Sequence, residues 1–133
     1  MTSPHHFTFL RRALTIDAAI SGTTALALLA GASLLEGPLG LSVSLLHGAG
    51  LSLIPFTALL IYLLRRDPLP RGAAWFVVVC NALWAVDSIL LLFTNWVDPT
   101  LLGQVFVVFQ AIVVAAFAEL QYVALRRSAP ALA

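Results

Sequence analysis

Charge is scarce in this chain, and one cationic residue type is missing altogether. Only 10% of the 133 residues are charged, none of them is lysine, and 61% are hydrophobic. The mean hydropathy is +1.00. Because a soluble domain carries about a quarter charged residues, most of this surface is not built to face water. With no basic tract either, we expect no nucleic acid among the partners of this chain.

Cysteine and catalytic motifs are scarce as well. Cys80 is the single cysteine, so an intramolecular disulfide is excluded and a thiol–disulfide exchange enzyme is disfavoured. The sequence has no nucleophile motif, no Gly-rich phosphate loop and no cluster with metal-ligand spacing. His47 is the one histidine inside an apolar run, so haem held by two histidines would require a dimer. We expect no cofactor and no metal, and we lean against an enzyme.

Long hydrophobic runs, in contrast, fill most of the chain. Four of them, at about 14–35, 45–64, 73–94 and 101–125, are each near the roughly 20 residues that a membrane-spanning helix needs. Little chain is left over, so we treat residues 1–133 as one transmembrane domain. The predicted fold class is an all-α membrane protein with four transmembrane helices in an up-down-up-down bundle.

The cationic residues predict the orientation of this bundle. Four spans bring all of them to one side, whereas the opposite loops, 36–44 and 95–100, have no positive charge; they are Arg11, Arg12, Arg65, Arg66, Arg71, Arg126 and Arg127. Short arginine-rich loops stay in the cytoplasm. We therefore predict that both termini are cytoplasmic, that the protein is multi-pass in the bacterial inner membrane, and that it does not insert in two orientations. The run 10–33 imitates a signal peptide, but Asp17 interrupts it and we expect it to be retained.

Two short links carry local predictions. The link 67–71 contains Pro68 and Pro70, and each proline prevents a helix from continuing through it. We expect the second and third helices to be tight antiparallel neighbours. Asp98 and Pro99 have the residue types of a helix N-cap and first turn, so we expect the last helix to begin there.

Each predicted span contains one ionisable residue that is costly in a membrane: Asp17, His47, Asp87 and Glu119. An acid at the bilayer centre costs about 2.5–3.5 kcal/mol, and such groups face the bundle interior or water. Counting about 1.5 Å per residue from the nearest arginine, Asp17 lies about 8 Å deep and Glu119 about 10 Å. Asp87 and His47 lie at about 24 and 27 Å. The sequence therefore predicts an inner and an outer polar layer.

The third span carries several polar side chains, of which Asn81, at about 15 Å, lies between the two layers. Asn81, Trp84 and Ser88 share one helical face with Asp87 beside it, and Gln110 of the last span falls at the depth of Asp87. These side chains would line a polar cavity, or they would only form hydrogen bonds to neighbouring helices, and the two interpretations stay open.

The sequence suggests different roles for the three acids Asp17, Asp87 and Glu119. A neutral His47 beside an ionised Asp87 would form a charge-assisted pair able to relay protons. Asp17 lies in the first turns of its helix, where the helix dipole favours a negative charge, so we favour a structural role. Glu119 lies near a helix C-terminus, where the dipole opposes it, and both roles stay open for it.

The chain resembles small bacterial four-helix integral membrane proteins that have no assigned activity. The resemblance rests on Leu14–Ala18 with Ser21–Gly22, on Leu53–Phe56, on Asn81–Trp84, on Pro99–Gly103, and on Gln110–Ala111 through Glu119–Tyr122. It implies a four-helix fold and assigns no catalytic role. The first span is also similar to small multidrug-resistance transporters, with an acid followed by Gly22-Thr23-Thr24, but the other spans depart from that family.

Three functional hypotheses follow. The first is a polar intramembrane cavity that binds or transports a small molecule or protons, with candidate residues His47, Asp87, Trp84, Asn81, Ser88, Gln110, Glu119 and Asp17. The second is a non-catalytic membrane subunit or assembly factor whose polar groups hold helices and partners together. The third, ranked last, is a membrane enzyme that uses a His47–Asp87 acid/base pair. Beyond the lipid bilayer, the expected partners are a second copy or another membrane protein.

Overall fold

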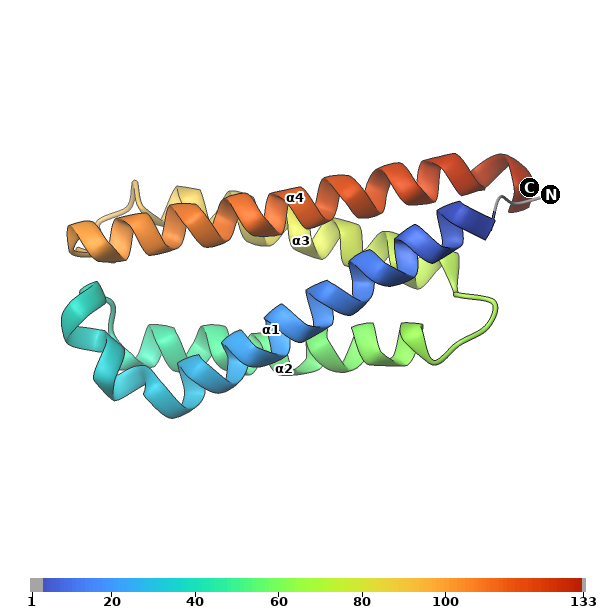
Figure 1. The fold of residues 1–133 in the computed structure, drawn as a ribbon. Helices are drawn as coiled ribbons and strands as arrows, with labels where there is room; N and C mark the ends of the chain where they lie inside the picture. Colours follow the sequence, from blue (N-terminus) through green and yellow to red (C-terminus); the bar gives the residue numbers. More distant parts are fainter. Residues whose placement is uncertain (1–3, 133) are drawn as a thin grey trace.

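Four helices make up the regular structure of the protein. The computed structural model describes residues 4–132, and the side chains of 8–127. The helices are α1 (Pro4–Leu39), α2 (Val43–Leu64), α3 (Arg71–Leu91) and α4 (Leu101–Leu132) (Figure 1). All four are long and apolar enough to cross a membrane. These features indicate a multi-pass membrane protein and confirm the predicted all-helical class.

The helix ends differ from the predicted ones in a consistent way. α1 begins at Pro4 instead of about residue 14, and α4 continues to Leu132 instead of ending near 125. Hydropathy detects the part of a helix that faces lipid, whereas the helical hydrogen bonds continue into the arginine-bearing ends because nothing there interrupts them. At the other end of the bundle, α3 stops at Leu91, three residues earlier than predicted.

The helices form two pairs that α1 joins. α1 packs along α2 and crosses obliquely towards α4, while α3 packs along α4 (Figure 1). The helices α2 and α3 barely touch, so the prediction that they are tight neighbours is wrong. The reason is that α2 packs along α1 and α3 packs along α4, so that α2 and α3 meet mainly through side chains such as Leu63 and Val77, which belong to one apolar cluster.

The buried apolar side chains form two separate clusters. One, around Leu10, Leu60 and Leu125, lies at the end of the bundle that carries the arginines. The other, around Leu28, Leu46 and Val107, lies towards the opposite end. Many large apolar side chains face outwards instead, as the surface of a lipid-facing bundle requires. The middle of the bundle, between the two clusters, contains the polar residues described below.

At the arginine end, side chains tie the helix ends together. Arg11 donates from Nη1 to the Leu64 carbonyl oxygen at 3.1 Å and from Nη2 to that of Arg66 at 2.6 Å. Arg71 donates from Nη2 to the Leu125 carbonyl oxygen at 3.2 Å. The start of α1, the α2–α3 link and the last part of α4 therefore lie at the same end of the bundle (Figure 1).

At the opposite end, the α1–α2 turn is fixed against the start of α4. Thr100 donates from Oγ1 to the Pro38 carbonyl oxygen at 2.7 Å and accepts at the same atom from the Gly103 amide at 3.1 Å. Thr100 is thus the N-cap, and the prediction of Asp98 is wrong, because only Thr100 lies in hydrogen-bonding position beside the turn. Gly103 is required here, since a Cβ at this position would collide with the Leu39 carbonyl oxygen.

Candidate functional site

A buried carboxylate lies where α1, α3 and α4 meet. Asp17 Oδ2 accepts hydrogen bonds from Asn81 Nδ2 at 2.9 Å and from Gln121 Nε2 at 2.8 Å. Ser21 Oγ donates to Asp17 Oδ1 at 3.0 Å, and Asn81 Nδ2 also reaches Gln121 Oε1 at 3.0 Å. We call these four residues, Asp17, Ser21, Asn81 and Gln121, the Asp17 cluster.

Hydrogen bonds alone hold this carboxylate. Asp17 is 3% exposed and Gln121 is fully buried. Within the described part of the chain, the one ion pair joins Arg11 to Asp67 at 4.0 Å, away from Asp17. A buried charge is tolerated only when its acceptors are satisfied, and three donors satisfy this one. The cluster therefore has the geometry of a helix-holding contact, as favoured for Asp17 from the sequence.

The cluster follows from local helical spacing combined with depth. Asp17 and Ser21 are four residues apart and so face the same side of α1. Gln121 was not among the residues predicted for the site. It lies five residues before Arg126, just as Asp17 lies five residues after Arg12. This equal distance from the arginines is the sequence signal that would have identified Gln121, because equal depth is a condition for contact between helices.

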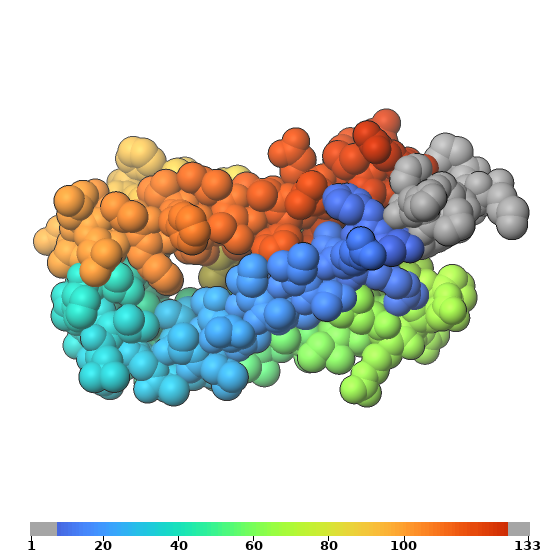
Figure 2. Space-filling view, viewed as in Figure 1, coloured from blue at the N-terminus to red at the C-terminus, as the bar shows by residue number. Residues whose placement is uncertain are grey.

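A cavity opens beside the cluster, between α2 and α3. Its volume is about 280 Å³. Ser21 and Asn81 of the Asp17 cluster belong to its wall; the other lining residues are Ser52, Leu53, Phe56, Cys80, Leu83, Trp84, Asp87 and Val114. Figure 2 shows the surface hollowed where α1 diverges from α4, with part of α3 visible behind. The poor contact between α2 and α3 leaves room for this cavity in the bundle.

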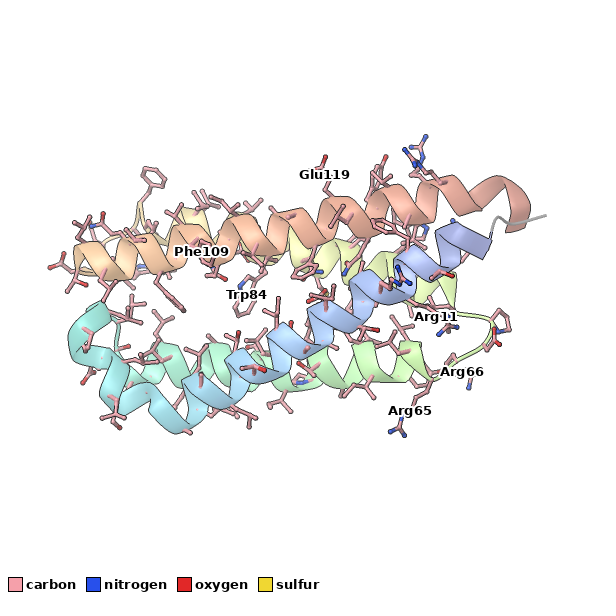
Figure 3. The ribbon with its side chains drawn as sticks, viewed as in Figure 1. Arg11, Arg65, Arg66, Trp84, Phe109 and Glu119 are labelled. Carbon is pink, nitrogen blue, oxygen red and sulfur yellow. The ribbon has the colours of Figure 1, made fainter. Side chains whose placement is uncertain are left out.

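The predicted polar face of α3 is divided between the cavity and the helix contacts. Trp84 lines the cavity and donates from Nε1 to Gln110 Oε1 of α4 at 2.9 Å. Gln110 in turn donates from Nε2 to the Val107 carbonyl oxygen at 2.9 Å. Ser88 bonds to the Trp84 carbonyl oxygen of its own helix at 2.7 Å. The bond to Gln110 fixes the indole ring, which points between the two helix pairs (Figure 3).

Asp87 differs from Asp17 in having no partner. It lines the cavity and its side chain is exposed. Among residues 8–127, no hydrogen bond or ion pair to its carboxylate is found. One acid in the bundle is therefore fully satisfied by the protein, and another is left available at the wall of a cavity.

The remaining candidates lie apart. His47 is half-buried on α2 and is not part of the cavity wall. The described side chains include no hydrogen bond or ion pair between His47 and Asp87, so the pair expected from their similar depth is not formed. Glu119 is exposed on α4 and points away from the bundle (Figure 3).

Metal ligands do not gather in the described part of the chain, where no group of three or more His, Cys, Asp or Glu side chains could hold an ion. Fold and site together indicate a helical multi-pass membrane protein with a small, open and mostly apolar cavity that has a few polar groups in its wall. No family model matches the chain, and no curated protein or solved structure matches it either.

Proposed function

We propose that this chain is an integral inner-membrane protein whose cavity binds a small amphipathic molecule. The observation that carries the proposal is the contrast between two acids. Asp17 accepts three hydrogen bonds and is buried, whereas Asp87 lines a cavity without a partner among the described residues. A polar group that only holds helices together has its bonds inside the protein, whereas the exposed carboxylate of Asp87 is available to a ligand in the cavity.

The orientation proposed for the bundle is up-down-up-down, with the arginine end in the cytoplasm. Its support is the gathering of the α1 start, the α2–α3 link and the end of α4 at one end, together with the positive-inside tendency. On this orientation Asp87, sixteen residues past Arg71, lies about 24 Å from the cytoplasmic end. The cavity then belongs to the outer half of the bundle, on the side away from the arginines.

The volume and lining of the cavity suit a small ligand that has both an apolar and a polar part. Its volume of about 280 Å³ is near the lower limit of ligand sites, which starts at about 300 Å³. Leu53, Phe56 and Leu83 supply apolar wall, and Ser52 and Asp87 supply polar groups. Because the lining residues Leu83 and Asp87 are exposed, the cavity is open at the side of the bundle and a ligand dissolved in the membrane can enter it there.

The second candidate, a non-catalytic membrane subunit, is favoured by the Asp17 cluster. Its carboxylate is satisfied by donors from α1, α3 and α4, as a structural contact between helices requires. This role is compatible with a binding cavity next to it. The enzyme hypothesis depended on a His47–Asp87 pair, and without that pair we do not propose it.

Trp84 provides a direct binding test, because its ring lies in the cavity wall. Trp75→Phe and Trp96→Phe leave it as the sole tryptophan. The protein in lipid nanodiscs is titrated with two probes, benzyltrimethylammonium and its neutral carbon analogue neopentylbenzene, and Trp84 fluorescence is followed. We expect a saturable change with at least one probe.

Two matched variants show whether the change comes from the cavity. Cys80→Phe places a ring inside the cavity, and Val79→Phe places the same ring at the neighbouring position, which is 52% exposed and does not line it. Binding should be lost in Cys80→Phe and kept in Val79→Phe. If neither probe gives a saturable change, or if Cys80→Phe binds as well as Val79→Phe, the proposed function is wrong.

A further inference from the structure

The charges of this chain are distributed unequally between the two ends of the bundle. All seven arginines lie at the end formed by the start of α1, the α2–α3 link and the last part of α4. The other half contains the acids Glu36, Asp87 and Asp98 and has neither arginine nor lysine. An excess of one sign around a low-dielectric opening attracts ions of the opposite sign. The cavity therefore lies in a region that favours cations.

Asp87 places one of these negative charges in the cavity itself. No cationic side chain of the described residues pairs with its carboxylate. An ionised carboxylate inside a membrane span is costly unless it is paired or solvated. A cationic ligand would supply the missing partner, whereas an anionic ligand would be repelled.

A second carboxylate lies behind the cavity wall. Ser21 and Asn81 both line the cavity, and both donate their hydrogen bonds to Asp17. No described arginine pairs with Asp17. Asp17 is only 3% exposed, so water screens its oxygen atoms weakly. These oxygens contribute partial negative charge on the side of the cavity that faces α1.

Aromatic rings complete the surroundings of a cation. Trp84 is three residues before Asp87, and both line the cavity. The indole N–H is already used by Gln110 at 2.9 Å, so the ring faces are what Trp84 can offer to a ligand. Phe56 of α2 also lines the cavity. A ring face attracts a cation, most strongly where water is excluded.

From these observations we infer that the cavity binds a small organic cation, an ammonium group carrying an apolar substituent. The ammonium is placed at Asp87 beside Trp84, and the substituent contacts Leu53, Phe56 and Leu83. This inference rests on the proposed function, since it assigns a charge to the ligand of the same cavity. A monovalent metal ion would leave the apolar wall uncovered, so an organic cation fits the lining better.

The decisive comparison is between two probes of the same shape. Benzyltrimethylammonium and neopentylbenzene differ in one atom, nitrogen for carbon, and therefore in charge. Their dissociation constants are measured in nanodiscs through Trp84 fluorescence, with correction for partitioning into nanodiscs that contain no protein. We expect the cation to bind about 10- to 100-fold more tightly, as a desolvated charge pair allows.

Two substitutions then assign this preference to one residue. Asp87→Asn should weaken binding of the cation about 10- to 100-fold and leave the neutral probe within about twofold. Glu119→Gln removes an exposed acid on the face of α4 away from the cavity and should change neither constant. The wild-type preference can be measured even if Asp87→Asn does not fold.

The outcomes separate this inference from the proposed function. If the neutral probe binds as tightly as the cation in the wild-type protein, the cavity binds ligands without regard to their charge; the inference is then wrong, whereas the proposed binding cavity stands. A cation preference that survives in folded Asp87→Asn also overturns the inference. If neither probe binds, both proposals are wrong.

Discussion

Gln121 donates a hydrogen bond of 2.8 Å from Nε2 to Asp17 Oδ2, although 104 positions separate the two residues in the chain. Asn81 adds a bond of 2.9 Å to the same oxygen. One buried carboxylate thus connects α1, α3 and α4 in the layer between the two apolar clusters. Apolar side chains can slide past one another at small cost, whereas these bonds require a single register of the three helices.

The first prediction concerns the stability of this cluster. Asp17→Leu removes the acceptor of one buried N–H of Asn81 and one of Gln121, although Asn81 keeps its bond to Gln121 Oε1, and we expect it to lower the free energy of unfolding by about 2–4 kcal/mol. Asp17→Asn should cost less than about 1 kcal/mol, because its amide oxygen can accept both bonds while its nitrogen donates to Ser21 Oγ. Reversible unfolding in a detergent titration with SDS measures both values.

A triple variant tests whether the cost comes from unpaired amides. Asp17→Leu combined with Asn81→Leu and Gln121→Leu removes donors and acceptor together, so we expect it to be more stable than Asp17→Leu alone. Equal stability of Asp17→Leu and Asp17→Asn would contradict the structural role of the cluster.

The sequence predicted this part of the site incompletely, for a physical reason. It identified Asp17 and Asn81 as costly residues because each polar group in an apolar span is visible without any structure. Their contact depends on how far α1 tilts across the bundle, and tilt results from packing of all four helices. The estimated depths, about 8 Å for Asp17 and about 15 Å for Asn81, therefore placed Asp17 in the inner layer and Asn81 between the two layers.

The second prediction concerns the contact between the α1–α2 turn and the start of α4. Gly103→Ala should destabilise the protein by about 1–3 kcal/mol or more, because the new Cβ collides with the Leu39 carbonyl oxygen and the backbone has to move. Gly48→Ala is the matched control, since nothing lies within 4 Å of a Cβ at that position. Unfolding in detergent should separate the two variants, and equal stability would show that the close approach is not essential.

The third prediction concerns the orientation in the membrane. Gly37→Cys and Asp67→Cys, each with Cys80→Ala, place a single thiol at opposite ends of the bundle, at exposed positions. A membrane-impermeant maleimide should label Gly37→Cys in intact spheroplasts and label Asp67→Cys only after lysis. The reverse labelling would show that the arginine end faces outwards, and labelling of both in intact spheroplasts would indicate two orientations.

The cavity was partly predictable, and its electrostatic character was not. The helical spacing of Asn81, Trp84 and Asp87 predicted residues that do line it. The depth counted from the arginines also placed His47 in the same layer as Asp87, yet the two side chains form no hydrogen bond or ion pair among the described residues. Depth restricts two residues to one layer, but the rotation of α2 and its separation from α3 decide whether they meet. These depend on the packing of α2 against α1 and of α3 against α4.

The most direct test uses Cys80, which is the single cysteine of the chain and lines the cavity. Wild-type protein in nanodiscs is treated with methyl methanethiosulfonate, and mass spectrometry follows the modification rate with and without saturating benzyltrimethylammonium or neopentylbenzene. The control is Cys80→Ala with Val86→Cys, where the thiol lies at a position that is 54% exposed and outside the cavity. We predict that at least one probe slows modification of Cys80 and that neither slows the control. Modification of Cys80 at the same rate with both probes would contradict the proposed binding cavity.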